Sequence, residues 1–425
     1  MTTNIPRSLQ ALCVLAITSL LFSSCLKDSC TKIYTYKLYK PIYMGYDELR
    51  SAVKSLPASE LNSVGKIYYK APYLFVSEID KGIHIIDNSD PSNPQIKAFI
   101  NVPGCLDIAI RDNILYTDSY IDLVAIDITD PLNVKETSRN QNVFPDRVFA
   151  NGWTADPIQG VVTGWNIMDT TVEQNCGSMY AVSAFEDAFV SSFSGGTSSG
   201  NSAAVTPGIG VAGSLARFAI YNEFLYCLDN ASMKLFDISN AAAPDMSNSV
   251  QMPWNIETIF PYDHYLFIGS TTGVSIYDNA NPSNPVFVSE LSHVSSCDPV
   301  VVQGNYAYAT LRNGTTCQGF TNELEVIDIS NLKSPVLKAI VPLTHPFGLG
   351  IDGAHLFVCD DNAGLRRMDA QNPLTIEIKQ TVSAGETRDV IPLGGLLLLL
   401  STNGLYQFDY SSGELIQLSH LSIGN

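Results

Sequence analysis

Short apolar runs separated by turn residues follow one another along most of this chain. Between residues 256 and 291, four such runs occur, at 256–262, 265–270, 273–278 and 286–291. Their apolar positions are continuous or alternate with polar ones, which is typical of strands, whereas an amphipathic helix shows a period of about 3.6 residues. The pattern therefore predicts groups of four antiparallel strands.

A twelve-residue phrase recurs seven times and joins a short apolar strand to an aspartate and then to a turn rich in Asn, Asp and Pro. The aspartate is the fifth residue of each phrase, at Asp87, Asp127, Asp237, Asp278, Asp328, Asp369 and Asp409. Successive aspartates are 40, 110, 41, 50, 41 and 40 residues apart. Four-stranded units of about 40 residues are typical of propeller blades. We therefore predict an all-β fold, a seven-bladed β-propeller of four-stranded antiparallel blades, over residues 65–421.

The seven repeated aspartates allow two interpretations. Seven carboxylates at equivalent places would suit a catalytic role. An aspartate at the end of a strand also accepts backbone N–H groups of the turn that follows, and prolines such as Pro91 and Pro282 then keep that turn out of the ladder. We expect the turn-stabilising role.

The phrase resembles the LVIVD repeat, a strand followed by aspartate that occurs in β-propeller lipoproteins of the bacterial envelope. The best matches are LEVIDIS at 324–330, IHIIDNSDPSNP at 83–94 and SIYDNANPSNP at 275–285. The third, sixth and seventh phrases depart from the pattern in their strand or turn residues. The resemblance covers nearly everything from Lys66 to Leu421, and it implies an architecture and a location but no reaction.

The first residues have the features of an export signal. Arg7 precedes an apolar run at 12–22, which is too short to span a membrane, and Ser-Ser-Cys follows at 23–25. The sequence LFSSC resembles a lipobox, so we predict a signal peptide at 1–24 and lipid on Cys25, with 25–32 as a tether; simple secretion is the alternative. We expect a membrane-anchored protein of the cell envelope, with the outer membrane favoured and its side left open.

Charge and motifs exclude several classes of function. The formal net charge is −18, which argues against nucleic acid as a partner. The chain contains no H-E-x-x-H, C-x-x-C, G-x-S-x-G or Walker motif, and its six histidines lack metal-ligand spacing. We therefore predict no catalytic residue, no cofactor and no metal.

A propeller can still assemble a site at its central channel, because the inner strands of all blades converge there. Aligning the predicted inner strands brings charged residues to corresponding positions in six blades, with Phe347 in the remaining one; these are Lys66, Asp107, Arg217, Glu257, Asp298 and Arg388. Such a ring could bind a charged small molecule or a metal. We favour the other interpretation, a mutually neutralising set of ion pairs that fills the channel.

Two interruptions of the repeat mark candidate binding regions. The longer, at 141–214, contains Trp153 and Trp165 and predicts a β-extension of the second blade followed by a Gly/Ser-rich connection. The shorter lengthens a loop of the fifth blade that carries Arg312, Cys317 and Phe320. Loops on a repeat scaffold often carry function, although a surface embellishment is an equal alternative for the longer one.

Cys297 and Cys317 are predicted to form a disulfide between two loops of the fifth blade, because both loops lie on the same face and an exported chain meets oxidising conditions. That face, with His293, Asp298, Arg312, Phe320 and the channel residues Lys66, Asp107, Arg217, Glu257 and Arg388, is the predicted binding face. By contrast, Cys227 and Cys359 occupy equivalent second-strand positions and are expected to be small buried apolar residues.

The N-terminal piece at 33–64 alternates like a strand and then predicts a short helix, which we expect to pack on the propeller at a blade edge. Taken together, these features favour a non-catalytic, envelope-anchored binding or scaffold protein that recognises a protein or a glycan through one propeller face. The alternative is an enzyme of hydrolase or quinone-dependent type with its site at the channel mouth.

Overall fold

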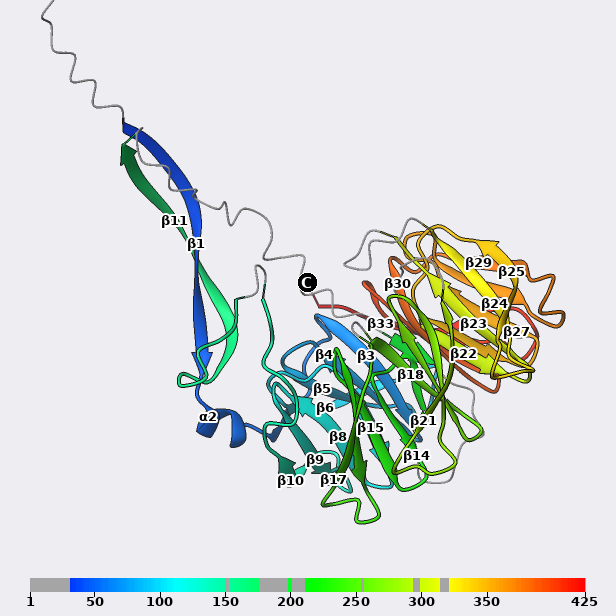
Figure 1. Cartoon of the computed structure of the whole chain (residues 1–425), viewed down its shortest axis with the longest axis horizontal. Coiled ribbons are helices and arrows are strands. Elements are labelled where there is room, and N and C mark those ends of the chain that lie inside the picture. Colours follow the sequence, from blue (N-terminus) through cyan, green and yellow to red (C-terminus); the bar gives the residue numbers. More distant parts are fainter. Residues whose placement is uncertain are drawn as a thin grey trace, which may run out of the picture. The chain divides into compact units, whose positions relative to one another are not determined.

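Seven four-stranded antiparallel sheets form the body of the protein. The structure is a computed structural model that describes residues 31–149, 153–175, 198–200, 211–253, 256–292, 299–313 and 321–424. The blades follow the chain in order, and each is made of four consecutive strands (Figure 1). The predicted seven-bladed, all-β propeller is thus confirmed.

The first four blades, each given from its inner to its outer strand, are β3 (Val64–Lys70), β4 (Tyr73–Glu78), β5 (Gly82–Asp87) and β6 (Gln95–Asn101); β7 (Ile108–Arg111), β8 (Ile114–Ser119), β9 (Asp122–Asp127) and β10 (Lys135–Asn140); β14 (Phe218–Tyr221), β15 (Phe224–Leu228), β16 (Ser232–Asp237) and β17 (Asp245–Gln251); and β18 (Ile256–Tyr262), β19 (Tyr265–Ser270), β20 (Gly273–Asp278) and β21 (Val286–Ser292).

The last three blades are β22 (Val300–Gln303), β23 (Tyr306–Leu311), β24 (Glu323–Asp328) and β25 (Val336–Pro342); β26 (Leu349–Asp352), β27 (His355–Cys359), β28 (Leu365–Asp369) and β29 (Glu377–Val382); and β30 (Thr387–Leu393), β31 (Leu396–Ser401), β32 (Gly404–Asp409) and β33 (Ile416–Ser422).

Each repeated aspartate ends the third strand of its blade and accepts the backbone N–H of the residue two positions later. The acceptor oxygen lies 2.8 to 3.1 Å from the donor nitrogens, which belong to Ser89, Thr129, Ser239, Ala280, Ser330, Gln371 and Ser411. Hydroxyl and backbone donors also lower the pKa of Asp87 and Asp328. The turn-stabilising interpretation is therefore confirmed.

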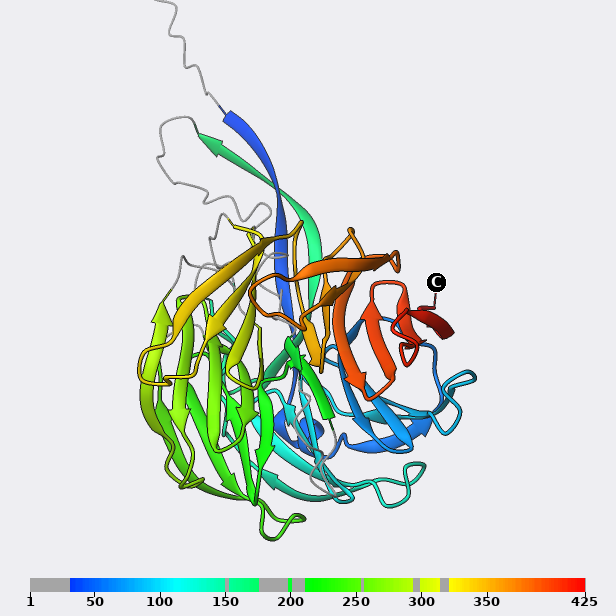
Figure 2. The ribbon, with the colours of Figure 1, turned by 90° about the vertical axis from the view of Figure 1, so that its right-hand side faces the viewer.

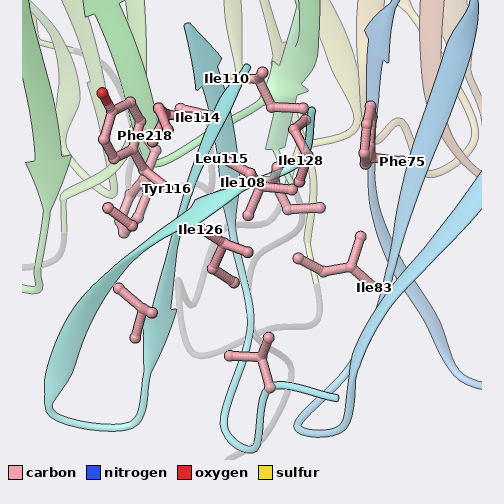
Figure 3. Close-up of a cluster of buried hydrophobic side chains, with 14 of the residues drawn as sticks. Phe75, Ile83, Ile108, Ile110, Ile114, Leu115, Tyr116, Ile126, Ile128 and Phe218 are labelled. Carbon is pink, nitrogen blue, oxygen red and sulfur yellow. The ribbon is translucent and has the colours of Figure 1, made fainter. Parts of the chain in front are cut away.

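The core lies between neighbouring blades, where apolar side chains of successive sheets face each other. In Figure 3, Phe75 and Ile83 of the first blade face Ile108 and Ile126 of the second. Phe218 of the third blade joins the same cluster. Fully buried side chains of this size each contribute about 1.5–3 kcal/mol to stability, so the stacking of blades, and not any single sheet, holds the ring together.

A further strand lies in the channel. β13 (Val211–Leu215) pairs antiparallel with the inner strand β3, with Ala212 opposite Tyr68, and β12 (Ser198–Gly200) pairs with β13. β13 also contacts β18, β26 and β30, the inner strands of the fourth, sixth and seventh blades. A strand that touches inner strands on several sides of a ring fills its centre. The end of the insertion at 141–214 thus occupies the channel, which the sequence pattern did not indicate.

The first and last blades meet at a seam without exchanging strands. Two buried amides bond reciprocally there: Asn88 Nδ2 donates to Gln407 Oε1 at 3.0 Å, and Gln407 Nε2 donates to Asn88 Oδ1 at 2.7 Å. Ser419 Oγ donates to the Pro91 carbonyl at 2.7 Å. Figure 2 shows the blue strands of the first blade beside the orange and red strands of the last. Side chains and one backbone bridge, in which Leu61 pairs with Ile423 and its carbonyl accepts the Gly424 N–H at 2.7 Å, therefore close the ring without a shared four-stranded sheet.

Residues before the first blade pack on its outer side and on the second blade. β2 (Lys54–Pro57) pairs with β6, the outer strand of the first blade. In the short helix α2 (Tyr46–Arg50), Leu49 is fully buried and Arg50 Nε donates to Asp122 Oδ2 at 3.0 Å. These contacts place residues 46–57 against the edge of the first blade and the second blade.

A two-stranded ribbon is formed by β1 (Thr31–Met44) and β11 (Val161–Asn175). Residues 31–40 and 165–175 belong to a unit separate from the propeller. Within that unit, Tyr39 and Trp165 pack edge to face with ring centroids 6.5 Å apart. In the part of the chain that the structure describes, no helix has the length and apolar character needed to cross a membrane.

Candidate functional site

The inner strands show which of the predicted channel residues are equivalent. In each blade, one residue of the inner strand pairs with the residue nine positions later in the second strand, for example Ile67 with Val76 and Val390 with Leu399. This pair identifies the equivalent positions in the seven inner strands. Lys66, Asp107 and Arg217 immediately precede such residues and are equivalent, as predicted.

Three other predicted members are displaced from this position. Thr258, Gly348 and Asp389 are equivalent to Lys66, so Glu257, Phe347 and Arg388 lie one residue too early and the sequence alignment was wrong for them. In the fourth and seventh blades a β-bulge interrupts the start of the inner strand, so alternation there no longer marks the register. Asp298 lies outside the described residues.

The channel contains a buried cluster of charges around Lys66. Its Nζ lies 3.8 Å from Asp107 Oδ2 and donates to the Leu215 carbonyl of the channel strand β13. Burial lowers the pKa of Lys66, while Asp107 and Asp389 oppose that shift. Burial also raises the pKa of Asp389 to about 8. With β13 above it, this cluster supports the interpretation of ion pairs that fill the channel.

A second cluster forms around Phe347. The guanidinium carbons of Arg312 and Arg388 lie 4.4 and 4.1 Å from the centre of its ring. Arg388 also pairs with Glu386 and Asp361. Arg312 is only 3% exposed, so its cation packs inside the protein. The structure therefore joins Arg312 and Arg388 of the predicted face in one stack on Phe347, in which Arg312 is buried and Arg388 is partly exposed.

Several predicted residues of that face lie outside the described residues, namely His293, Cys297, Asp298, Cys317 and Phe320. The disulfide between Cys297 and Cys317 accordingly stays a prediction. The expectation for Cys227 and Cys359 is confirmed, because both are buried free thiols, and burial raises their pKa well above the ordinary value.

A pocket of about 720 Å³ opens between the second and third blades. It brings together Asp107 and Arg217 from the inner-strand ends, Asp118 from the end of β8 and the loop 142–148 that follows β10. Phe144 and Phe218 stack beside it with ring centroids 5.8 Å apart. The pocket thus combines apolar walls with a small set of charged groups, as ligand sites usually do.

Two of the three cations of the pocket are already engaged. Lys234 Nζ lies 3.2 Å from Asp229 Oδ2. Arg147 donates to Asp80 Oδ1 at 2.6 Å and lies over the ring of Tyr120. Arg217 differs, since its one side-chain hydrogen bond among the described residues is a long contact of 3.4 Å to Asn230, and its buried Nε finds no partner there.

Among the carboxyl groups of the pocket, Asp118 has the pKa that is shifted most. Its Oδ1 accepts the backbone N–H groups of Leu106 at 2.8 Å and Asp107 at 3.0 Å. Burial nevertheless dominates and raises its pKa to about 6 from the ordinary 3.8. Among the described residues, no group of three His, Cys, Asp or Glu side chains could hold a metal ion.

Replacing Asp118 with asparagine should change how stability depends on pH. Between about pH 4 and about pH 6 the folded protein keeps a proton that the unfolded chain has lost, so the stabilisation by this group is complete below pH 4 and disappears as the pH rises to 6. The asparagine oxygen still accepts both N–H groups. Measured by urea unfolding, the stability of the variant relative to the native protein should rise by about 2–3 kcal/mol from pH 4 to pH 7.

The control for this prediction is Asp229→Asn, because hydrogen bonds and Lys234 lower the pKa of Asp229. That variant should lose stability relative to the native protein as the pH rises through the acid range, and show no change between pH 5 and 7. A stability difference for Asp118→Asn that is flat from pH 4 to 7 would contradict the assignment.

Sequence reasoning missed Asp118, Arg147, Asp229 and Lys234 as pocket residues. One signal was present, because Glu78, Asp118 and Asp360 each lie nine residues before a repeated aspartate. Asp360, like Asp118, accepts two backbone N–H groups from the loop before an inner strand, those of Thr344 and His345. An acidic residue at this spacing therefore indicates a side chain that holds the loop leading into an inner strand.

Solved structures similar to this chain share its fold. Saccharomyces cerevisiae Sqt1 is 8% identical, with 88% of each chain covered and a TM-score of 0.50. BamB from Moraxella catarrhalis is 10% identical, with 88% of this chain and 97% of that chain covered and a TM-score of 0.46. AztD from Citrobacter koseri is 9% identical, with 88% and 95% covered and a TM-score of 0.44. At such identities the likeness concerns the fold alone.

Comparison with protein families gives a match to the repeat itself. Residues 66–102, 212–252 and 296–342 match the LVIVD repeat. No curated protein matches this sequence. The matched segments fall in the first, third and fifth blades, and the same strand, aspartate and turn recur in the blades between them. The chain therefore carries LVIVD repeats, and they build a seven-bladed β-propeller.

Proposed function

We propose that this protein is a non-catalytic, lipid-anchored binding or scaffold protein of the bacterial envelope, which recognises its partner through the mouth between the second and third blades. The observation that carries the proposal is the pocket of about 720 Å³, which opens beside the channel. The charged cluster around Lys66, in contrast, is buried against β13 and already paired. Recognition at the mouth therefore fits the structure better than chemistry inside the channel.

The mouth is also suited to a macromolecular partner. The loop 142–148 forms part of the pocket wall, and its Val148 is 64% exposed. An exposed apolar side chain in the wall of a pocket adds to the surface that a bound partner can cover. The lipid on Cys25 would hold this surface at a membrane, where an envelope protein or glycan is within reach.

Site-specific photo-crosslinking in cells tests the proposed face. A benzophenone amino acid at Val148 should capture a partner, whereas the same group at Ile416 on the outer strand β33 should not. Ile416 is a matched control, because it is also an exposed apolar residue, with 54% exposure. Adducts from Ile416 and none from Val148 would move the recognition surface to the blade edges.

Membrane fractionation tests the anchor separately. Cys25→Ala should leave the precursor uncleaved or release the protein from the membrane fraction, because the lipid would be its attachment. Cys13→Ala, a cysteine change inside the apolar signal run, should fractionate like the native protein. If Cys25→Ala stays in the membrane fraction as a processed protein, the lipoprotein proposal is wrong.

A further inference from the structure

We propose that Arg217 is the ligand-binding cation of the pocket and that it takes the carboxylate of a singly charged ligand with an apolar substituent. This inference rests on the proposed recognition by the mouth between the second and third blades, and it adds the chemical class of the group recognised. Its starting point is a guanidinium whose hydrogen-bonding capacity the protein leaves largely unused.

The main chain holds Arg217 firmly, although its side chain has few partners. The backbone N–H of Arg217 donates to Asp107 Oδ2 at 2.6 Å, and the Ala216 carbonyl accepts the backbone N–H of Ile259 at 3.0 Å. These bonds fix the start of the inner strand β14. The guanidinium then lines the pocket, with a buried Nε that has no hydrogen-bond partner among the described residues.

The carboxylates of Asp107 and Asp229 do not compensate for this cation, because their oxygens already accept other hydrogen bonds and ion pairs. Asp107 accepts the backbone N–H groups of Ile108 and Arg217 and pairs with Lys66. Asp229 accepts the N–H groups of Ala231 and Ser232 and pairs with Lys234. A buried guanidinium donor without a partner is costly, and an incoming carboxylate offers the planar pair of acceptors that matches it.

The charge balance of the pocket favours one negative charge over two. Its lining carries four acids, Asp107, Asp118, Asp146 and Asp229, and three bases, Arg147, Arg217 and Lys234. A carboxylate brings a single charge to the free cation, whereas a phosphate dianion would meet the surrounding acids with twice the repulsion. The shape of the guanidinium and the charge of its surroundings therefore both indicate a carboxylate.

Apolar side chains determine what the carboxylate should carry. The accessible apolar surface of the pocket comes from the loop 142–148, where Val148 is 64% exposed and the half-buried Phe144 packs on the buried Phe218. An apolar group next to the carboxylate would cover these surfaces at about 25 cal/mol per Å² of apolar area removed from water. A peptide C-terminus with a large apolar residue and a free aryl or alkyl acid share this chemistry.

The test uses N-acetylphenylalanine as the probe and its amide as the uncharged match, with isothermal titration on the purified mature protein. We expect binding of the acid in the millimolar range, on the order of what a small ligand achieves, and binding of the amide weaker by about tenfold or more. Inorganic phosphate should bind more weakly than the acid. Equal binding of acid and amide, tighter binding of phosphate, or binding of neither probe would overturn the proposal.

Variants locate the site. Arg217→Gln should lower the affinity for N-acetylphenylalanine by about tenfold or more. Lys135→Gln, which removes an exposed charge from the outer strand β10, should leave that affinity unchanged. Arg217→Lys retains the positive charge but loses the paired N–H donors of the guanidinium, so it should bind the acid with intermediate affinity. If Arg217→Gln unfolds, the affinity of Arg217→Lys tests the assignment instead. Native affinity in both Arg217 variants contradicts the assignment.

A first comparison distinguishes a peptide C-terminus from a free acid as the source of the carboxylate. A second distinguishes failure of the carboxylate site from failure of macromolecular recognition by the mouth. A peptide ending in phenylalanine that binds more tightly than N-acetylphenylalanine indicates a peptide terminus, while equal affinity indicates a free acid; either result supports the carboxylate site. If the acid binds through Arg217 but Val148 gives no crosslink in cells, the carboxylate site stands and macromolecular recognition by this mouth fails. If Val148 gives crosslinks but the acid does not bind, recognition by the mouth stands and the carboxylate site fails.

Discussion

Replacing Lys66 with methionine is expected to lower the free energy of unfolding by about 3–5 kcal/mol. The lysine is 7% exposed and supplies the positive charge between Asp107 and Asp389 in the channel. Methionine has a similar length but leaves both buried carboxyls without their cation, and it also releases the Leu215 carbonyl of β13. Urea unfolding at pH 7 measures the loss.

The matched control is Lys81→Met. Lys81 also pairs with a buried carboxylate, that of Glu78, but its own side chain is 59% exposed, so the loss should stay below about 1 kcal/mol. Adding Asp389→Asn to Lys66→Met should change the stability little at pH 7, because the pKa of Asp389 is raised to about 8 and its carboxyl already carries a proton there. An effect of Lys66→Met no larger than that of Lys81→Met would show that the channel cluster does not stabilise the fold.

The second large effect is expected at the seam between the first and last blades. Asn88→Ala should cost about 2–4 kcal/mol, because it leaves the amide N–H and oxygen of Gln407 buried without their partners. Gln407 is fully buried and Asn88 is 6% exposed. The double variant Asn88→Ala and Gln407→Ala should lose less than the sum of the single losses, which a double-mutant cycle measures by chemical unfolding.

Gln303→Ala provides the comparison. Gln303 also makes a reciprocal amide contact between neighbouring blades, with the Gly353 carbonyl at 2.8 Å and its N–H at 2.9 Å, but that contact is exposed. Its loss should cost less than about 1 kcal/mol, since water replaces the missing partner. Equal costs at the two sites, or additive losses at the seam, would contradict a special role for the buried pair.

The fold was readable from the sequence because its signals are local. An aspartate such as Asp328 bonds to Ser330 two residues later, so the turn chemistry lies within the phrase itself. The apolar runs are equally local, since each forms one strand that is buried between blades. Repetition of these local signals gave the number of blades and the strands in each.

The site was less predictable because it depends on contacts between distant segments. Asp389 was passed over for Arg388, since a β-bulge before it shifts the register without changing the composition of the strand. β13 comes from a Gly-rich stretch with no strand pattern, and only its pairing with β3, more than 130 residues earlier, makes it a strand. Similarly, the unused donors of Arg217 follow from where its neighbours direct their oxygens, which no spacing in the sequence records.

The agreement between one repeat and one blade has a consequence for how such a chain changes its size. Because no strand is shared between blades, duplication or deletion of one internal repeat adds or removes a complete sheet. The seam cannot be copied in this way, since the positions of Asn88 and Gln407 are filled by Ile128 and Ile85 at the junction of the first two blades. Copy number can therefore vary only among the inner repeats, while the first and the last must be inherited together as a matched pair.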